Sequence, residues 1–214
     1  MCREELGAGP QIIQSPLLKI ELLPIEQDVS KYQALIFTSE NGVRAYVKSQ
    51  GQVGLPAFCV GQRTTKAATD AGLKALSANG TADELVALVQ GAEPDGPILH
   101  IRGEHTRGNI AQRIDAQVDE AVAYRQAPVN LTDEAQSGLQ GDRAVILPLF
   151  SPRTAQLFFK LVTKSNAQLH VVAISEAVKE AILGSNPPEN MVISVADTPD
   201  AAAMLRAIKR CIVT

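Results

Sequence analysis

Strand-to-helix corners with a hydroxyl group at the turn are the feature that most limits how this chain can fold. ALIF, residues 34–37, runs into Thr38 and Ser39 and then into a helix-like segment. AVILPLF, residues 144–150, runs into Ser151 in the same way, 112 positions after Ser39. A corner of this kind is typical of a buried strand that is followed by an N-capped helix.

The match between the two halves extends beyond these corners. Residues 58–72 align with residues 172–184, and TAD at 81–83 aligns with TPD at 198–200. The order is the same, and the offset drifts only from 112 to 117. These matches predict two copies of one α/β unit. The alternative is a chance match, because all α/β proteins share such corners.

Short apolar runs alternate with amphipathic segments along the whole chain. The expected strands are residues 11–14, 34–37, 57–60, 97–101, 118–124, 144–150, 169–174 and 191–195. The expected helices are residues 63–72, 82–91, 106–115, 153–162, 176–184 and 200–209. Gly72, Gly91 and Gly184 stand where helices are expected to end. The alternation predicts an α/β fold with parallel sheets that are covered by helices on both faces.

Composition excludes several classes of protein. The 214 residues lie between one large domain and two small ones. The net charge of −3 argues against a nucleic-acid-binding protein. No run approaches the roughly 18 apolar residues that a membrane helix needs. The opening MCREELGAG has no apolar core typical of a signal peptide, so we expect a cytoplasmic protein with free thiols.

The repeat also leads to an expectation about the start of the chain. The second copy is preceded by a strand–helix–strand unit. If the first copy had the same unit before it, the offset of 112 would place the helix of that unit across Met1 and upstream of it. Only the helix end, REELGAG, and the strand at 11–14 would then remain. We therefore expect either that the first sheet lacks a strand or that the start of the chain is assigned too late.

Common catalytic motifs are absent from the sequence. It has no glycine-rich dinucleotide fingerprint, no phosphate loop and no nucleophile elbow. His100 and His170 lie in expected strands, where a core or sheet-face role is favoured, and His105 lies in a loop. No metal site is predicted, and Cys59 in the run AFCV is expected to be a core residue.

The recurring corners are the candidate binding site. They follow one strand after another and comprise Thr38, Ser39, Gly61, Arg102, Gly103, Ser151 and Ser175. Ligands of parallel sheets bind outside the carboxyl ends of the strands, and helices that begin there offer unpaired N–H groups to anions. The corners together predict an anionic ligand. For each serine alone, the alternative is an ordinary N-cap worth about 1 kcal/mol.

Basic residues also fall near these corners. They are Arg63, Lys66, Arg102, Arg107 and Arg153. Their positions predict a local concentration of positive charge in a chain that is acidic as a whole.

The ordered set of motifs resembles the uroporphyrinogen-III synthase family. The matching pieces are LIFTSENGVRAY, FCVGQRTTKAATDAG, TADEL, ILHIRGEHTRGNI, VDEAVAYRQ, LFSPRTAQLFF and VAISEAVKEAI, in the order that the family has. The resemblance covers nearly everything from Ser15 to the C-terminus. The resemblance implies two flavodoxin-like, three-layer α/β domains joined by two antiparallel linker strands. One domain would comprise 1–17 and 129–214, the inserted domain 24–122, and the linkers 18–23 and 123–128.

The family's reaction converts the linear tetrapyrrole hydroxymethylbilane to uroporphyrinogen III. The resemblance implies that the substrate loses its hydroxyl group as water, that the ring closes and that the last pyrrole is inverted, without a cofactor. The substrate's eight carboxylates suit a set of helix N-termini. Nothing in the sequence indicates more than a monomer, and no nucleic acid or membrane partner is expected.

The resemblance also assigns roles to two residues. Tyr124 would donate a hydrogen bond to the departing hydroxyl group, and the alternative is a linker aromatic packed against Pro128. Thr64 would contact the substrate, and the alternative is a structural residue in the first turn of a helix. Glu176 follows Ser175 where the family often has uncharged residues, and its charge would repel a carboxylate. Two other functions remain open, a non-catalytic two-lobed anion-binding module and an inactive relative.

Overall fold

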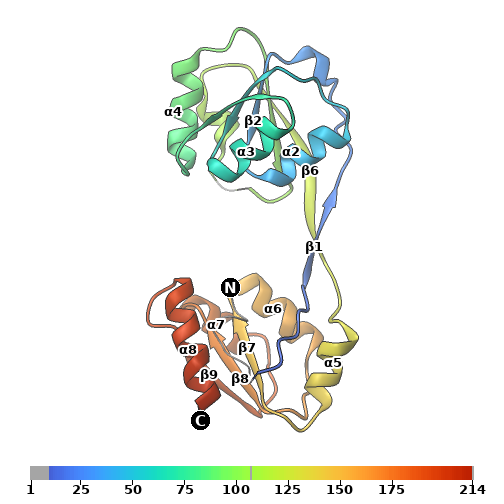
Figure 1. Cartoon of the computed structure of the whole chain (residues 1–214), viewed down its shortest axis with the longest axis vertical. Coiled ribbons are helices and arrows are strands. Elements are labelled where there is room, and N and C mark those ends of the chain that lie inside the picture. Colours follow the sequence, from blue (N-terminus) through green and yellow to red (C-terminus); the bar gives the residue numbers. More distant parts are fainter. Residues whose placement is uncertain (1–9, 107, 214) are drawn as a thin grey trace. The chain divides into compact units, whose positions relative to one another are not determined.

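The chain divides into two compact units. The computed structural model describes residues 10–106 and 108–213 (Figure 1). Unit 1 comprises Met1–Lys19 and Pro128–Thr214, and unit 2 comprises Ile20–Ala127. Most of the two segments that the resemblance treats as linkers therefore belongs to unit 2. The expected helix end at REELGAG lies outside the described residues.

The sheet of unit 2 has six strands in the order β1-β6-β5-β2-β3-β4. The strands are β1 (Leu18–Leu22), β2 (Ala34–Phe37), β3 (Pro56–Cys59), β4 (Lys74–Ser77), β5 (Ile98–Gly103) and β6 (Val118–Pro128). The pairs β2–β3, β2–β5, β3–β4 and β5–β6 are parallel. All four residues of β2 are buried, as a strand covered on both faces requires.

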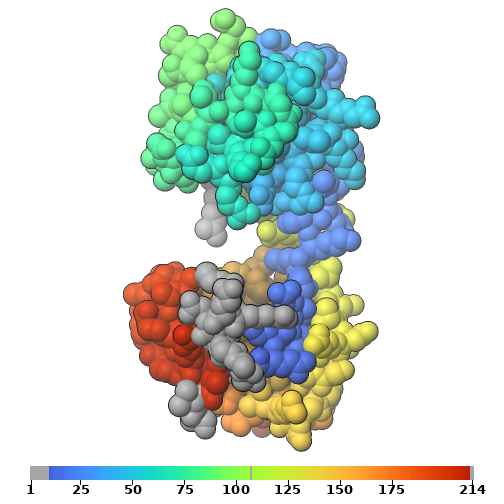
Figure 2. Space-filling view, viewed as in Figure 1, coloured from blue at the N-terminus to red at the C-terminus, as the bar shows by residue number. Residues whose placement is uncertain are grey.

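Helices cover both faces of this sheet. One face carries α2 (Glu40–Lys48) and α3 (Gln62–Asp70), whose apolar residues pack on Leu35 and Phe37. In the space-filling view, residues of α2 and α3, coloured light blue to teal, cover the face turned to the viewer (Figure 2). The other face carries α4 (Ala82–Ala92) and the 3₁₀ helix η2 (Ile110–Arg113), which pack on Ile36. A further 3₁₀ helix, η1 (Val29–Lys31), precedes β2.

The strand order of unit 2 defines a topological switch point. The chain runs from β2 outward to β3 and β4, then returns to the other side of β2 to form β5 and β6. Counted over these five parallel strands, the order is 3-2-1-4-5, whereas flavodoxin itself has the order 2-1-3-4-5. Both orders are doubly wound. In such sheets the ligand binds where the direction of winding reverses, which here is between β2 and β5.

Unit 1 is a second layered α/β unit. Its described strands are β7 (Val145–Leu149), β8 (Leu169–Ala173) and β9 (Met191–Val195), all parallel and in chain order. The helices are α5 (Asp133–Gln140), α6 (Pro152–Leu161), α7 (Glu176–Leu183) and α8 (Ala201–Val213). Residues of α5, α6 and α7 form one core, and α8 packs on the opposite face, at the left in Figure 1.

Two sequence predictions of secondary structure are wrong. Residues 11–14 are not a strand; Pro10 and Pro16 flank them, and proline cannot donate a ladder hydrogen bond. The described residues of 106–115 contain only the short η2, because Gly108 (φ 93°) and Asn109 (φ 43°) are left-handed and interrupt a helix. Strand β4 and helix α5 were not predicted, since neither has a strong apolar pattern.

The three glycines expected at helix ends behave differently. Gly72 has a φ of 82° and follows the last residues of α3, and Gly184 is the C-cap of α7. Gly91 is inside α4 instead, and Glu93 takes the left-handed position at its end. The prediction for Gly91 is therefore wrong, because the glycine is simply tolerated within the exposed face of the helix.

Gly42 is expected to tolerate no side chain, even though it lies in a helix. A Cβ atom there would lie 2.9 Å from the carbonyl oxygen of Ile101 and 3.3 Å from the ring of Phe37. We expect Gly42→Ala to lower the free energy of unfolding by about 1–3 kcal/mol, because the crowding exceeds the roughly 1 kcal/mol gained by helix propensity.

The matched control is Gly91→Ala in α4, where a Cβ would meet no described atom within 4 Å. This variant should raise the free energy of unfolding by about 0.5–1 kcal/mol. Urea denaturation of both variants measures the difference. Equal effects of the two substitutions would contradict the close approach of α2 to β5.

Candidate functional site

The predicted corners of unit 2 lie along one edge of its sheet. Strands β5, β2 and β3 are parallel neighbours, so their carboxyl ends meet at the same edge, and the parallel strand β6 continues past this edge to Pro128. This edge holds Tyr124, Gly103, Ser39 and Gly61, taken in strand order. The corner after β4 is close as well, since a Cβ atom at Gly61 would lie 3.7 Å from Cα of Gly80.

Ser39 is the N-cap of α2. Its Oγ accepts a hydrogen bond from the backbone N–H of Asn41 at 3.2 Å, and its backbone is extended. Ser39 and its neighbour Thr38 are half-buried. The first N–H groups of a helix have no intrahelical partner, so this corner presents them, and the positive end of the helix dipole, at the switch point.

Gly61 is the N-cap residue of helix α3. Among the described residues, no side chain caps this helix, because glycine has none to offer. Thr64 lies in its first turn and is only 5 % exposed. That burial favours the structural alternative for the Thr64 side chain, and it leaves the backbone N–H groups of the turn as the polar groups at this corner.

The corner after β5 contacts Tyr124 directly. The register of β5 and β6 shifts between Arg102 and Gly103, so that Gly103 lies opposite Tyr124. The backbone N–H of Glu104 donates to the carbonyl oxygen of Tyr124 at 2.9 Å. A Cβ atom at Gly103 would lie 2.8 Å from Cε2 and 3.1 Å from the hydroxyl oxygen of Tyr124. The half-buried ring of Tyr124 therefore rests on the glycine.

The basic residues near this edge are paired with acids. Arg63 lies 2.6 Å from Glu40, and the Lys66 ammonium lies 2.8 Å from Asp70. Arg102 Nε lies 3.1 Å from Oε1 of Glu120. Arg107 lies outside the described residues. The expected concentration of positive charge is therefore offset by neighbouring carboxylates, although the exposed pairs of Arg63 and Lys66 are weak and a polyanion can displace them.

Unit 1 repeats the arrangement with two serines. Ser151 caps α6, accepting from the N–H of Thr154 at 3.1 Å. Ser175 is the N-cap position of α7, but in the described structure its side chain makes no capping hydrogen bond. The two corners are adjacent, because the N–H of Ile174 donates to the carbonyl oxygen of Leu149 at 3.0 Å.

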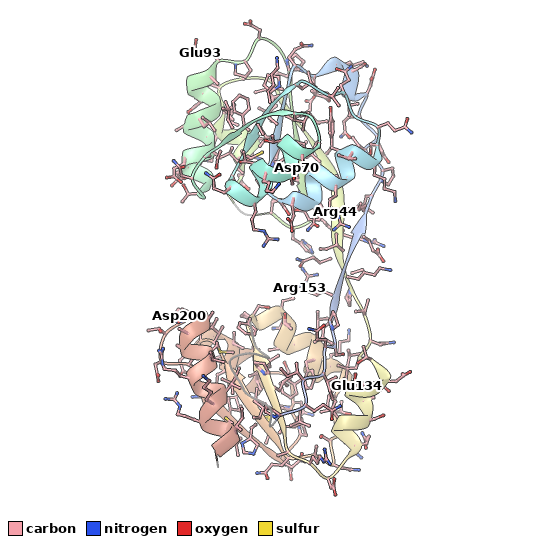
Figure 3. All side chains as sticks on the ribbon, in the orientation of Figure 1. Arg44, Asp70, Glu93, Glu134, Arg153 and Asp200 are labelled. Atoms are coloured by element: carbon pink, nitrogen blue, oxygen red, sulfur yellow. The ribbon has the colours of Figure 1, made fainter. Side chains whose placement is uncertain are left out.

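Charged residues flank this second edge. Arg153 lies in the first turn of α6, and Asp200 precedes the first turn of α8 (Figure 3). Oδ1 of Asp200 accepts from the N–H of Ala203 at 2.9 Å, which caps α8. Glu176, the acid expected to repel a carboxylate, lies 3.3 Å from Lys179, so part of its charge is balanced.

Sequence reasoning missed a polar cluster beside the first edge. His100 is 1 % exposed, and its Nδ1 lies 3.3 Å from Oε1 of Glu120, the same oxygen that Arg102 Nε approaches. Burial lowers the pKa of His100 below its ordinary value of 6.5, against the upward effect of Glu120. His100 was predicted to be a hydrogen-bonded core or sheet-face residue, and its burial confirms the core position, although neither ring nitrogen makes a hydrogen bond to a described residue. The signal for the cluster was the alternation of His100 with Arg102 on one strand.

The depressed pKa of His100 predicts a loss of stability in mild acid. Below about pH 6.5 the unfolded chain binds a proton at this residue that the folded chain does not bind. The free energy of unfolding should therefore fall as the pH drops from 6.5 towards the folded pKa, with a slope that approaches about 1.4 kcal/mol per pH unit. Urea denaturation between about pH 5 and pH 8 measures this slope.

His100→Gln should flatten the slope, because the titrating group is removed. Parallel curves for the parent chain and His100→Gln would show that another group causes the acid sensitivity.

Other possible sites are not supported in the part of the chain that the structure describes. Cys59 is buried in the core as predicted, and burial raises the pKa of its thiol to about 11. No group of His, Cys, Asp or Glu side chains among these residues is placed to hold a metal ion. A hollow of about 300 Å³ between α5 and the end of α6 is lined by none of the predicted site residues. None of the described helices combines the length and apolar character of a membrane span.

Fold and site together define a class of protein. The chain is a two-domain α/β protein with mostly parallel sheets, and the carboxyl edge of each sheet carries helix N-termini and hydroxyl groups. Such edges bind anionic ligands.

Comparison with known proteins gives the family. A sequence profile described as uroporphyrinogen-III synthase HemD matches residues 4–206. The chain therefore belongs to the uroporphyrinogen-III synthase family, and its function is that of this cyclising lyase of porphyrin biosynthesis. No curated protein sequence matches the chain.

A solved structure has the same fold. The crystal structure of uroporphyrinogen-III synthetase from Helicobacter pylori 26695 superposes with a TM-score of 0.63 at 19 % sequence identity. The match covers 89 % of this chain and 88 % of the other. At this identity the likeness is one of fold.

Proposed function

We propose that the carboxyl edge of unit 2 binds carboxylates of hydroxymethylbilane and presents Tyr124 to its hydroxymethyl group. The observation that carries this proposal is the position of Tyr124, whose ring rests on Gly103 one strand away from the switch point. A half-buried phenol beside helix N-termini can donate a hydrogen bond while the helices hold an anionic substrate.

The proposed role of Tyr124 concerns the first bond to break. The hydroxyl group of the substrate leaves as water, which requires a proton and leaves a cationic carbon on the first pyrrole. A hydrogen bond from the Tyr124 hydroxyl group stabilises the departing oxygen. The last pyrrole then attacks this carbon through its substituted α-carbon and loses its N–H proton, which gives a spiro intermediate and returns the proton used to form water. The bond between the spiro carbon and the neighbouring methylene bridge breaks. That bridge then bonds to the free α-carbon of the same pyrrole, and the proton on that carbon moves to the ring nitrogen to give the inverted ring.

The other corners are proposed to bind and orient the substrate. Thr38, Ser39, Gly61 and Thr64 would act mainly through backbone N–H groups, and Arg102 and Gly103 would form the wall beside Tyr124. Ser151 and Ser175 would offer the same groups on unit 1. The hydroxyl group of Ser175 is the best placed of these, since capping does not use it in the described structure. Ring closure needs little chemical activation, so holding one conformation is the main task.

We further propose the finer features that the family resemblance implies. Residues 18–23 and 123–128 would be antiparallel linkers between a domain of 1–17 with 129–214 and a domain of 24–122. The enzyme would act as a cytoplasmic monomer without a cofactor and without a nucleic-acid partner.

The isomer distribution of the product tests this function. The protein is incubated with hydroxymethylbilane, the products are oxidised, and uroporphyrin isomers I and III are separated by chromatography. We expect isomer III to dominate, whereas without enzyme the substrate closes to isomer I. Unchanged formation of isomer I would favour the two remaining alternatives, a non-catalytic anion-binding module or an inactive relative, and substrate binding by calorimetry then distinguishes them.

A further inference from the structure

Three polar side chains on β5 and β6 share one carboxylate oxygen. His100 and Arg102 are two residues apart on β5 and so point to the same face, and Glu120 is the register partner of His100 on β6. Oε1 of Glu120 lies 3.3 Å from Nδ1 of His100 and 3.1 Å from Nε of Arg102. This one oxygen therefore makes the ion-pair contact of both basic groups.

The other end of Arg102 holds the corner that follows. Nη1 of Arg102 donates to the carbonyl oxygen of Gly103 at 3.0 Å and reaches the carbonyl oxygen of Glu104 at 3.4 Å. These two carbonyl groups directly follow the register shift between Arg102 and Gly103. Because the guanidinium group is planar and rigid, fixing Nε also fixes Nη1, and so fixes the corner.

The corner in turn holds Tyr124. Its backbone accepts from the N–H of Glu104 at 2.9 Å, and its ring rests on Gly103. A continuous chain of contacts thus runs from Glu120 through Arg102 and the corner to the phenol. A small displacement at Glu120 is passed on by rigid groups.

The burial of polar atoms in His100 and Arg102 is a second argument that this cluster does more than stabilise the fold. Arg102 Nε and both ring nitrogens of His100 are buried, yet none makes a hydrogen bond of good geometry to a described residue. Such groups cost folding free energy, and an apolar side chain at position 100 would avoid that cost. The polar cluster costs folding free energy and lies beside the proposed catalytic phenol. Such clusters are typical of residues that orient a functional site.

We propose that Glu120 is a positioning residue for Tyr124, acting through Arg102 and the corner at Gly103 and Glu104. The inference rests on the proposed function of Tyr124. Glu120 itself does not touch the reacting atoms. Its carboxylate holds the phenol in the pose that meets the departing hydroxyl group.

Kinetics of Glu120→Gln test the effect on the reaction. We expect kcat to fall about tenfold and KM to stay within about twofold, because the pose of the phenol changes and substrate binding does not. Glu120→Asp, which keeps the charge but is shorter, should retain an intermediate kcat. The matched control is Asp83→Asn, which removes the partner of Arg113 at 2.6 Å on α4 and should leave both constants unchanged.

A double-mutant cycle separates positioning from a general loss of structure. In a Tyr124→Phe background, Glu120→Gln should cause no further loss of kcat beyond about twofold, since the group being positioned is already gone. The same tenfold loss in both backgrounds would overturn the proposal, because Glu120 would then act independently of Tyr124.

A measurement by ¹⁹F NMR, made without substrate, distinguishes a failure of the positioning role of Glu120 from a failure of the proposed function of Tyr124. The chain has three tyrosines, so incorporation of 3-fluorotyrosine gives three ¹⁹F resonances, and the one lost in Tyr124→Phe belongs to Tyr124. Glu120→Gln should shift the Tyr124 resonance and leave that of Tyr46 unchanged, and Asp83→Asn should shift neither. An unmoved Tyr124 resonance would refute the positioning role. If the resonance moves but Tyr124→Phe has normal turnover, the proposed function of Tyr124 fails instead.

Discussion

Replacement of Tyr124 by phenylalanine is expected to lower turnover by more than about tenfold and to leave the fold intact. The change removes only the hydroxyl group that is proposed to donate to the departing oxygen. The ring remains, so its contact with Gly103 and the backbone bond from Glu104 should persist. Stability should change little, because the side chain is half-buried at an edge of the sheet.

The measurement combines initial rates of uroporphyrinogen III formation with thermal unfolding. As kcat falls, spontaneous closure competes, and the share of isomer I should rise. Tyr46→Phe is the matched control: its hydroxyl group donates to the carbonyl oxygen of Gln52 at 2.9 Å within a core, where Tyr46 is 2 % exposed. This control should lose about 1 kcal/mol of stability with turnover unchanged. Normal turnover in Tyr124→Phe would remove this residue from the mechanism.

Gly103→Ala is expected to reduce turnover about as strongly, for a different reason. The added methyl group would lie 2.8 Å from the ring of Tyr124, which is too close, so one of the two must move. The nearest atoms are at the far end of a side chain that can rotate, and therefore the ring moves and the backbone does not. The hydroxyl group is then displaced from its pose, and a displacement of about 1 Å can cost up to about a hundredfold in rate.

The stability of Gly103→Ala, in contrast to its turnover, should change little. Gly103 is not in the left-handed region, so alanine can adopt its backbone conformation, and the free energy of unfolding should fall by less than about 1.5 kcal/mol. Gly141→Ala in unit 1 is the control, since a Cβ there would meet its nearest neighbour at 3.5 Å, an ordinary contact. Full activity in Gly103→Ala, with a ¹⁹F resonance of Tyr124 like that of the parent, would contradict the close packing of this ring.

The sequence predicted only those features of the candidate site that depend on residues close together in the chain. Ser39 and Ser151 were expected as N-caps, and both cap the helices that follow, because a cap depends on residues within three positions. Thr64 was left between two interpretations, and only its burial favours the structural one for its side chain. The pairing of Arg63 and Arg102 with acids was not foreseen, since Glu40 and Glu120 are distant in sequence.

The sequence by itself determined the α/β class, the two copies of the corner and, to within one residue, the starts of helices α3, α4, α6, α7 and α8. These follow from the spacing of apolar residues and from hydrogen bonds between near neighbours, which act within a few positions of the chain. Tertiary structure alone decided the strand order, the switch point between β2 and β5, and the register that sets Gly103 opposite Tyr124. The reason is that strand pairing joins residues far apart in sequence, and its choice depends on how whole faces of the sheet are buried.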